Sequence, residues 1–476
     1  MKRIISIIYV SALFVFTPLS ALAHGFGQRI DLPIPLNFYL IGAGLTVAVS
    51  FMLIGLIAHR GSHIDSYPRF NLLKIGWCRA LVEGPIFVPA LKVFFVLLLL
   101  LIVVAGFIGK QGSTFNIAPT FVWILFGVGM TYLSAFIGNI WQVINPWKNI
   151  FEVFEKIAGR ALSLRIEWPK SFGLWPALIL FFAYRWIENV YPDAADPSSL
   201  AVVIVAYSVV TFWGMFTFGK ENWLKYGDPF AVFFGFLSRF SITESRKVGG
   251  KKELNLRPPA VGLFDGVGAG VSQMFFVLFM LSSVAFDGAK VTPVWNVFSL
   301  FLLEKVGLSL IIVNSMGLLL LLLIFVTIYL VFSALVRLFA RSREKVGTLG
   351  YRFVFSLLPI AIVYEVAHFV TLLFVEGQRA IYLISDPFGW GWNLFGTAAY
   401  KISYQVINLK SLWHWQVGLI VVGHIIAVYI AHIIAIHLFH DRRRAMVSQY
   451  PMLALMVLYT VFSLWIIAQP IVVGLE

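Results

Sequence analysis

Residues 357–376 read LLPIAIVYEVAHFVTLLFVE, an apolar stretch long enough to form one membrane-spanning helix. Glu365 and His368 lie in its middle, three residues apart, so on a helix their side chains share one face. Ionisable side chains are costly in hydrocarbon and normally face the protein interior or a water-filled cavity. The pair therefore predicts a functional site inside a membrane domain.

The composition indicates a polytopic helical membrane protein. Of the residues, 60% are hydrophobic and only 12% are charged, and several apolar stretches exceed the length of one span. The formal net charge is +14, but lysine and arginine lie in short segments between apolar stretches, where membrane topology and anionic lipid explain them better than nucleic acid does. The single cysteine, Cys78, excludes an intramolecular disulfide and a cysteine-rich metal site.

The amino terminus is typical of a cleaved secretory signal over residues 1–23. Lys2 and Arg3 precede an apolar core, and Ala21-Leu22-Ala23 fits the small-residue cleavage pattern. Cleavage there leaves a single membrane domain over 24–476 that begins with His24. Such a residue can chelate a metal through its amine and ring, although it more often only reflects the cleavage position.

About ten spans are expected after the signal, which predicts an all-α fold. The positive-inside rule orients them, because every second loop is basic and the others are poor in charge or acidic. This places the mature amino terminus in the periplasm and the protein in an inner (cytoplasmic) membrane. The expected spans are 36–57, 90–109, 119–140, 172–190, 199–219, 266–286, 309–336, 353–375, 414–437 and 452–472.

Three connections differ from simple loops. Residues 220–265 are expected at the cytoplasmic side, with the apolar segment 228–235 too short to cross and lying at the inner interface. Residues 376–413 are expected in the periplasm and are rich in turn formers and aromatics, and 291–308 could be an amphipathic helix along the outer surface. These segments are candidates for lids.

Helix counting indicates which polar residues could meet. His368 lies roughly 10 Å inside the outer end of its expected span and His424 roughly 15 Å inside the next, so the two could share a level. Asp287 closes its span at the outer side, and Glu365 lies one turn below His368. His432 lies nearer the cytoplasmic side. Carboxylates and imidazoles are ligand types for zinc, iron, copper or manganese.

A structural interpretation of these residues stays open. Intramembrane histidine and glutamate can instead hydrogen-bond between helices and fix their packing. Arg185 and Glu188, three residues apart near the outer end of a span, more often form a self-neutralising pair than a site. His437 and His440 lie near the end of their span and favour an interfacial interpretation.

Several short stretches together resemble a bacterial family of integral membrane proteins named fenitrothion hydrolases. They run from the signal to the ninth span, so the resemblance covers most of the chain, and Glu365 lies outside it. The stretches are Ala23-His24-Gly25, Asp31-Leu32-Pro33, Asn145-Pro146-Trp147, 227–232, Ser282-Ser283, Phe286-Asp287-Gly288, Ala367-His368, Gly377-Gln378, Ser385-Asp386-Pro387, 391–396, Gly423-His424 and Ala431-His432.

The resemblance implies hydrolysis of an organophosphorus triester in the bacterial inner membrane. Such a substrate is small and apolar, so it could enter from the bilayer or the periplasm. A metal-bound hydroxide is the economical mechanism, with His368, His424 and Asp287 as ligands and Glu365 or His432 as base or supporting group.

Two other classes remain open. A transporter, or a protein for metal uptake or insertion, could use a histidine-lined path from His424 to His432 and on to His437 and His440. A structural subunit of a membrane complex, with an unidentified partner subunit, is the third. A hydrolase needs one compact site, whereas a carrier needs polar residues at successive depths.

Overall fold

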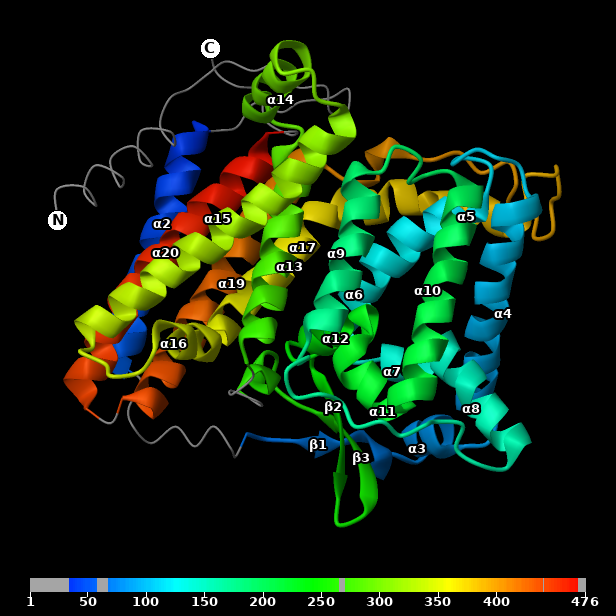
Figure 1. The fold of residues 1–476 in the computed structure, drawn as a ribbon, viewed down its shortest axis with the longest axis horizontal. Coiled ribbons are helices and arrows are strands. Elements are labelled where there is room, and N and C mark those ends of the chain that lie inside the picture. The colour runs from blue at the N-terminus through cyan, green and yellow to red at the C-terminus, as the bar shows by residue number, and fades with distance from the viewer. Residues whose placement is uncertain (1–33, 58–66, 265–269, 440, 470–476) are drawn as a thin grey trace.

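The computed structural model describes residues 34–57, 67–264, 270–439 and 441–469. Within these ranges the chain forms a bundle whose helices run between two faces, called here the upper and lower face as drawn in Figure 1. Helix α2 begins at the upper face, and the long helices then alternate in direction. The predicted signal peptide, 1–23, and His24 lie outside the described residues.

Nine helices in the described part of the chain are long and apolar enough to cross a membrane. This confirms a mostly helical fold of the multi-pass membrane type. Two of the nine are built from shorter pieces: α5 (Ile117–Pro119), η2 (Thr120–Gly129), α6 (Met130–Tyr132) and η3 (Leu133–Ile137) form one, and α16 (Val346–Phe353), η6 (Val354–Leu357) and α17 (Leu358–Phe374) the other. The remaining seven are α2 (Leu36–Ile57), α4 (Phe87–Ile108), α10 (Pro197–Phe218), α13 (Val271–Ala289), α15 (Leu310–Phe339), α19 (Leu409–Leu438) and α20 (Arg442–Ala468).

Helix α9 (Trp175–Val190) occupies the place of the remaining expected span. It has 16 residues, fewer than the roughly 20 that a helix needs to cross the hydrocarbon core. The predicted count of ten is therefore not confirmed, although α9 also runs between the lower and the upper face (Figure 1).

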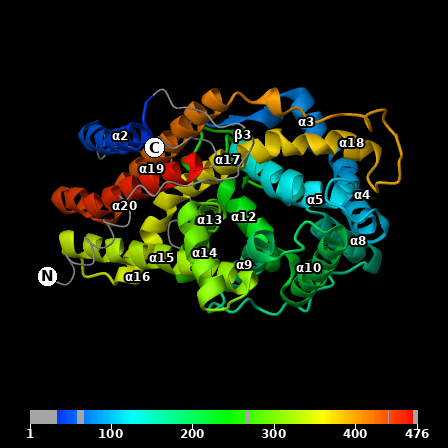
Figure 2. The same ribbon diagram turned by 90° about the horizontal axis from the view of Figure 1, so that it is seen from above.

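Helix α13 and the segment Val346–Phe374 form the centre of the bundle. In the most apolar 18-residue stretch of each, 83% and 72% of the stretch is buried inside the protein. The corresponding share for α4 is 17%. Figure 2 shows α13 and α17 between a group containing α2, α15 and α20 and a group containing α4, α8 and α10. Most residues of α13 and α17 are therefore enclosed by other helices, whereas those of α4 are not.

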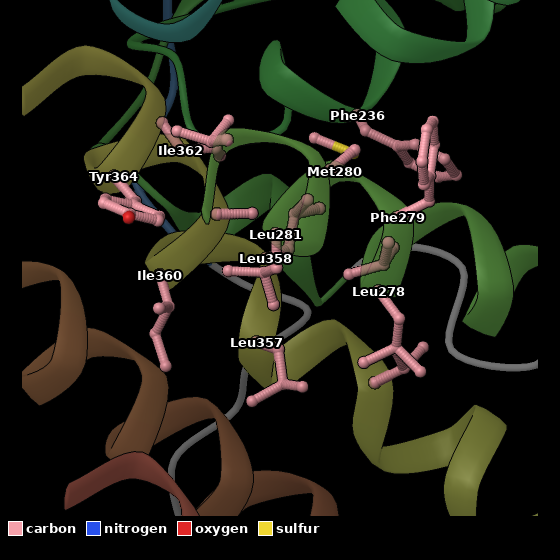
Figure 3. Close-up of a cluster of buried hydrophobic side chains, with 14 of the residues drawn as sticks. Phe236, Leu278, Phe279, Met280, Leu281, Leu357, Leu358, Ile360, Ile362 and Tyr364 are labelled. Atoms are coloured by element: carbon pink, nitrogen blue, oxygen red, sulfur yellow. The ribbon is translucent and has the colours of Figure 1, made fainter. Parts of the chain in front are cut away.

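The core between these two central elements is aliphatic and aromatic. Figure 3 shows side chains of α13 facing those of η6 and α17, with Phe236 of α12 packed beside them. Leu278, Phe279, Leu357 and Leu358 are each fully buried. Interiors packed in this way respond to the loss of single methylene groups, so the core fixes the relative placement of the two helices.

Polar capping residues set where several helices begin. The side chains of Asp196, Thr292, Ser309 and Asn408 each accept a hydrogen bond from the backbone N–H three residues further on, at the first turns of α10, α14, α15 and α19. Each cap satisfies a backbone donor that the helix itself leaves free. Short polar side chains therefore set the first residue of four helices at the upper face.

The lower face carries a small sheet that the all-α prediction did not include. Strands β2 (Thr243–Val248) and β3 (Lys251–Leu256) form an antiparallel hairpin, and β1 (Phe70–Asn71) pairs with the other edge of β3. Gly249 and Gly250 close the hairpin with positive φ angles of 56° and 80°, which glycine adopts without strain. The short helices near this face are η1 (Leu72–Lys74), α3 (Gly76–Glu83), α7 (Trp141–Ile144), α8 (Pro146–Ala158), α11 (Lys220–Asn222) and η5 (Val261–Leu263).

The apolar segment expected at the inner interface is instead a buried helix. It forms α12 (Pro229–Leu237), which follows the π-helical turn η4 (Trp223–Gly227) and packs against α9. Asp228 caps α12 and also accepts a hydrogen bond from Tyr207 of α10 at 2.5 Å. Because Phe233 and Phe234 are buried, α12 contributes to the core and not to a lipid-facing surface.

The upper face carries short helices between the long ones. The expected amphipathic segment 291–308 contains α14 (Pro293–Lys305), which exposes several large apolar side chains. The expected loop 376–413 contains η7 (Glu376–Gln378), α18 (Arg379–Ser385) and η8 (Tyr404–Val406). Phe388, Trp390 and Trp392 form an aromatic cluster in this loop, with ring centroids 4.5 to 5.5 Å apart.

The contact between α17 and α19 generates a test of the packing. A Cβ atom at Gly423 would lie 2.3 Å from a methyl carbon of Val363, whereas one at Gly418 would meet nothing within 4 Å. We expect Gly423→Ala to lower the free energy of unfolding by about 1–3 kcal/mol, because valine has little freedom to move aside. Gly418→Ala is the matched control on the same helix. Unfolding in detergent measures both, and equal stability of the two variants would contradict the packing.

Candidate functional site

Three helices bring charged side chains together in the upper half of the bundle. Asp287 and Lys290 lie at the end of α13, Glu365 and His368 lie on α17, and Arg185 lies on α9. Helix α13 packs against both α9 and α17, so it connects the other two. The expected pair on residues 357–376 therefore lies inside a larger polar network.

Asp287 and His368 form a direct pair. His368 Nε2 lies 2.8 Å from Asp287 Oδ2, and Lys290 Nζ lies 2.7 Å from the other carboxylate oxygen. The side chains of His368 and Asp287 keep 16% and 21% of their exposure, so the pair is partly open at the surface of the described protein. A carboxylate in this position fixes the orientation of the imidazole ring.

Arg185 and Glu365 form a second, fully buried pair. The guanidinium Nη2 contacts Glu365 Oε1, and Nη1 donates to Glu188 Oε2 at 2.8 Å. The exposed fractions of the Arg185 and Glu365 side chains are 5% and 2%. Four aromatic rings surround the guanidinium, with centroids 5.4 to 5.9 Å from its central carbon: Phe181, Tyr184, Phe233 and Phe369. Such faces favour a desolvated cation.

Asn189 connects the two pairs. Its side-chain amide donates to the backbone carbonyl of Arg185 at 3.0 Å and accepts from Lys290 Nζ at 2.9 Å. Tyr364 adds a polar atom nearby, since its ring centroid is 6.1 Å from that of His368 and its buried hydroxyl has no hydrogen-bond partner in the structure. A buried hydroxyl without a partner is costly, which distinguishes Tyr364 from the other residues around the Asp287–His368 pair.

His424 lies below this network. Gln416, eight residues before His424 on α19, donates to the carbonyl of Ala367, which directly precedes His368. At about 1.5 Å per residue, His424 therefore lies roughly 12 Å below the level of His368. The expectation that the two histidines share a level was wrong, because α19 begins at Leu409 and not near residue 414.

The two lower histidines are enclosed by helices. His424 is fully buried, and its Nδ1 lies 2.8 Å from the carbonyl oxygen of Ile420. His432 is 2% exposed, and its Nδ1 lies 2.8 Å from Gln449 Oε1 on α20. Neither belongs to the Asp287–His368 network.

The predicted metal ligands do not converge. Among the described residues, no group of three or more His, Cys, Asp or Glu side chains is placed to hold a metal ion. Asp287 and His368 bind each other, and His424 lies lower in the bundle. In this arrangement the set of His368, His424 and Asp287 does not fit a divalent metal, so no reaction step below is routed through one.

Sequence reasoning identified part of this network. The pairing of Arg185 with Glu188 is confirmed, but the contact of Arg185 with Glu365 on another helix was not foreseen. Lys290 and Tyr364 were also missed. The signal for Lys290 was available, since it follows Asp287 by three residues and such a spacing brings opposite charges together on a helix.

Comparisons with known proteins identify no relative. The chain matches no protein-family model, and neither the curated proteins nor the solved structures give a match.

The buried ion pair generates a stability prediction. We expect Arg185→Met to lower the free energy of unfolding by about 3–5 kcal/mol, because it leaves the buried Glu365 without its partner. Glu365→Leu should cost less, because Arg185 keeps Glu188 as a partner. The double variant should recover part of this loss. The free energies of unfolding of the wild type, the two single variants and the double variant, measured in detergent, complete the double-mutant cycle.

A matched control is the partly exposed pair of Arg379 and Glu376 at the upper face. Arg379→Met should change the free energy of unfolding by only about 0–1 kcal/mol. A cost of Arg185→Met no larger than this would show that the buried pair does not hold α9 to α17.

Proposed function

We propose that this protein is a membrane-bound hydrolase of apolar phosphotriesters and that His368 activates the attacking water. The observation that supports the proposal is the 2.8 Å contact between His368 Nε2 and Asp287 Oδ2 at a partly exposed position. In general-base catalysis a carboxylate holds the imidazole in one orientation and stabilises the imidazolium that forms.

The contact with Asp287 assigns a role to each ring nitrogen. With the Nε2 proton donated to Asp287, Nδ1 is the basic nitrogen and takes a proton from water as the water oxygen bonds to phosphorus. The bond between phosphorus and the aryl oxygen breaks, and a nitrophenolate leaves with the electron pair. His368 then returns its proton to solvent.

One neighbour, Tyr364, could stabilise the charge that develops on the phosphoryl or thiophosphoryl group. The buried hydroxyl of Tyr364 has no hydrogen-bond partner among the described residues and can donate a hydrogen bond. Lys290 keeps the Asp287 carboxylate paired at 2.7 Å. Hydrogen-bond donors placed before the reaction are most effective in a site from which water is excluded.

The substrate class follows from the sequence resemblance together with the surroundings. Fenitrothion-like triesters are neutral and apolar, so they partition into a bilayer. The long helices expose many large apolar side chains, as expected of surfaces that face lipid. A substrate dissolved in the bilayer could therefore reach a partly exposed pair at the upper end of α13.

We place the upper face in the periplasm and the protein in the bacterial inner membrane. The lower face carries the hairpin of β2 and β3, which contains Arg246, Lys247, Lys251 and Lys252 (Figure 1). Basic segments remain on the cytoplasmic side of the membrane. This orientation would give the catalytic pair access to substrates that arrive from outside the cell.

Nitrophenolate release by purified protein in detergent or nanodiscs tests the activity. We expect His368→Ala and Asp287→Asn each to reduce the hydrolysis of fenitrothion by 100-fold or more, as removal of a general base or its orienting group does. His414→Ala is the control, because His414 is an exposed histidine outside the network.

The outcomes are distinct. Hydrolysis that persists in both His368→Ala and Asp287→Asn would show that the proposed pair is not catalytic. Wild-type protein without activity would contradict the proposed function. A chelator tests the metal-hydroxide alternative: the direct mechanism predicts an unchanged rate, and loss of the rate together with bound metal in elemental analysis would favour the predicted metal site.

A further inference from the structure

A second set of polar residues lies on α19 and has no role in the proposed hydrolysis. Gln416, His424 and His432 are each at most 2% exposed. Gln416 Oε1, His424 Nε2 and His432 Nε2 have no hydrogen-bond partner in the structure. An unsatisfied buried acceptor costs about 1–3 kcal/mol, so three on one helix indicate small polar molecules between the helices.

The hydrogen bonds already made show that both imidazoles present a bare nitrogen. Gln449 Nε2 donates to the Ala445 carbonyl, so Gln449 Oε1 accepts a hydrogen bond from His432 Nδ1. His424 Nδ1 likewise donates to the Ile420 carbonyl. In a neutral ring the other nitrogen, Nε2, is then a proton acceptor.

The three residues extend over most of a bilayer. They recur every eight residues, and the 16 residues from Gln416 to His432 correspond to about 24 Å of a hydrocarbon core about 30 Å thick. At 100° per residue their side chains lie within an arc of about 160° of α19. Gln416 contacts α17 and His432 contacts α20, so the arc follows the boundary between those two helices.

Both ends of this set approach a face of the bundle. At the upper end, one turn above Gln416, the buried indole nitrogen of Trp413 also has no hydrogen-bond partner in the part of the chain that the structure describes. At the lower end His437, five residues beyond His432, is exposed. Polar groups therefore continue along α19 toward both faces.

The packing around these residues favours protons over larger ions. Gly423 lies so close to Val363 that even one added carbon would clash. Within the described residues, no three ligand side chains are grouped to replace the hydration shell of a metal ion. Of the species that a carrier could move, a proton needs the narrowest path and no ligand cage.

We propose that Gln416, His424 and His432 line a water-filled path that conducts protons between the two membrane faces. A protonated water gives its proton to a histidine Nε2, which becomes an imidazolium, and the same nitrogen returns the proton to the next water. Nδ1 keeps its proton throughout. Under the transporter interpretation, the proton is then the species that is moved. The path does not depend on the phosphotriesterase proposal.

Proton flux into liposomes tests the path. Full-length protein is reconstituted with a pH-sensitive dye inside, and a potassium diffusion potential drives protons inward. We expect wild-type protein to raise the rate of acidification tenfold or more over empty liposomes, and His424→Leu and His432→Leu each to abolish at least nine-tenths of that increase. His414→Leu should conduct like wild type, because its exposed ring lies outside the path.

Several outcomes would overturn the path. Wild-type flux equal to that of empty liposomes would do so, as would unchanged flux in both leucine variants. If His424→Leu fails to fold, as judged by its elution from a sizing column, His432→Leu and Gln416→Leu decide the question. Hydrolysis is measured on the same preparations, where His368→Ala should lose hydrolysis and keep proton flux, so that each proposal can fail alone.

Discussion

The contact between Arg185 and Glu365 is the constraint on which the upper half of the bundle depends. Removing two charges from water costs several kcal/mol per ion, and here the cost is offset by their attraction, by Glu188 and by four aromatic rings. Breaking such a pair is costly, so α9 cannot slide along α17. The fixed register of α9 places Asn189 beside Lys290, and Lys290 in turn holds the Asp287 carboxylate against His368.

Most of the helical fold could be predicted from the sequence, because the cost of exposing backbone groups to lipid leaves helices as the solution for long apolar stretches. The site could be predicted only in part. The cost of intramembrane charge correctly marked Glu365 as a residue that faces the interior. It also drew attention to His368 and Asp287, which pair with each other at a partly exposed position. It could not show that Glu365 meets Arg185, since the helices are apolar on all sides and their periodicity does not identify their neighbours.

The errors have physical causes. The depth of His424 was misjudged because helix ends are set by caps such as Asn408 and not by hydropathy alone. The hairpin of β2 and β3 was missed because its strands are short and carry charged residues at half of their positions, which leaves no sustained alternating apolar pattern. The π-helical turns of η2 and η3 change which side chains of that span face α17, and the apolar periodicity of the sequence does not indicate them.

The short length of α9 has a consequence for the lipid beside it. Its 16 residues cover about 24 Å, several ångströms less than the usual hydrocarbon thickness. A bilayer adapts to such a hydrophobic mismatch by thinning locally, at a modest cost per ångström. The headgroup region would then lie closer to Glu188 and Lys290. Water and molecules dissolved in the acyl chains could therefore meet within a short distance of His368.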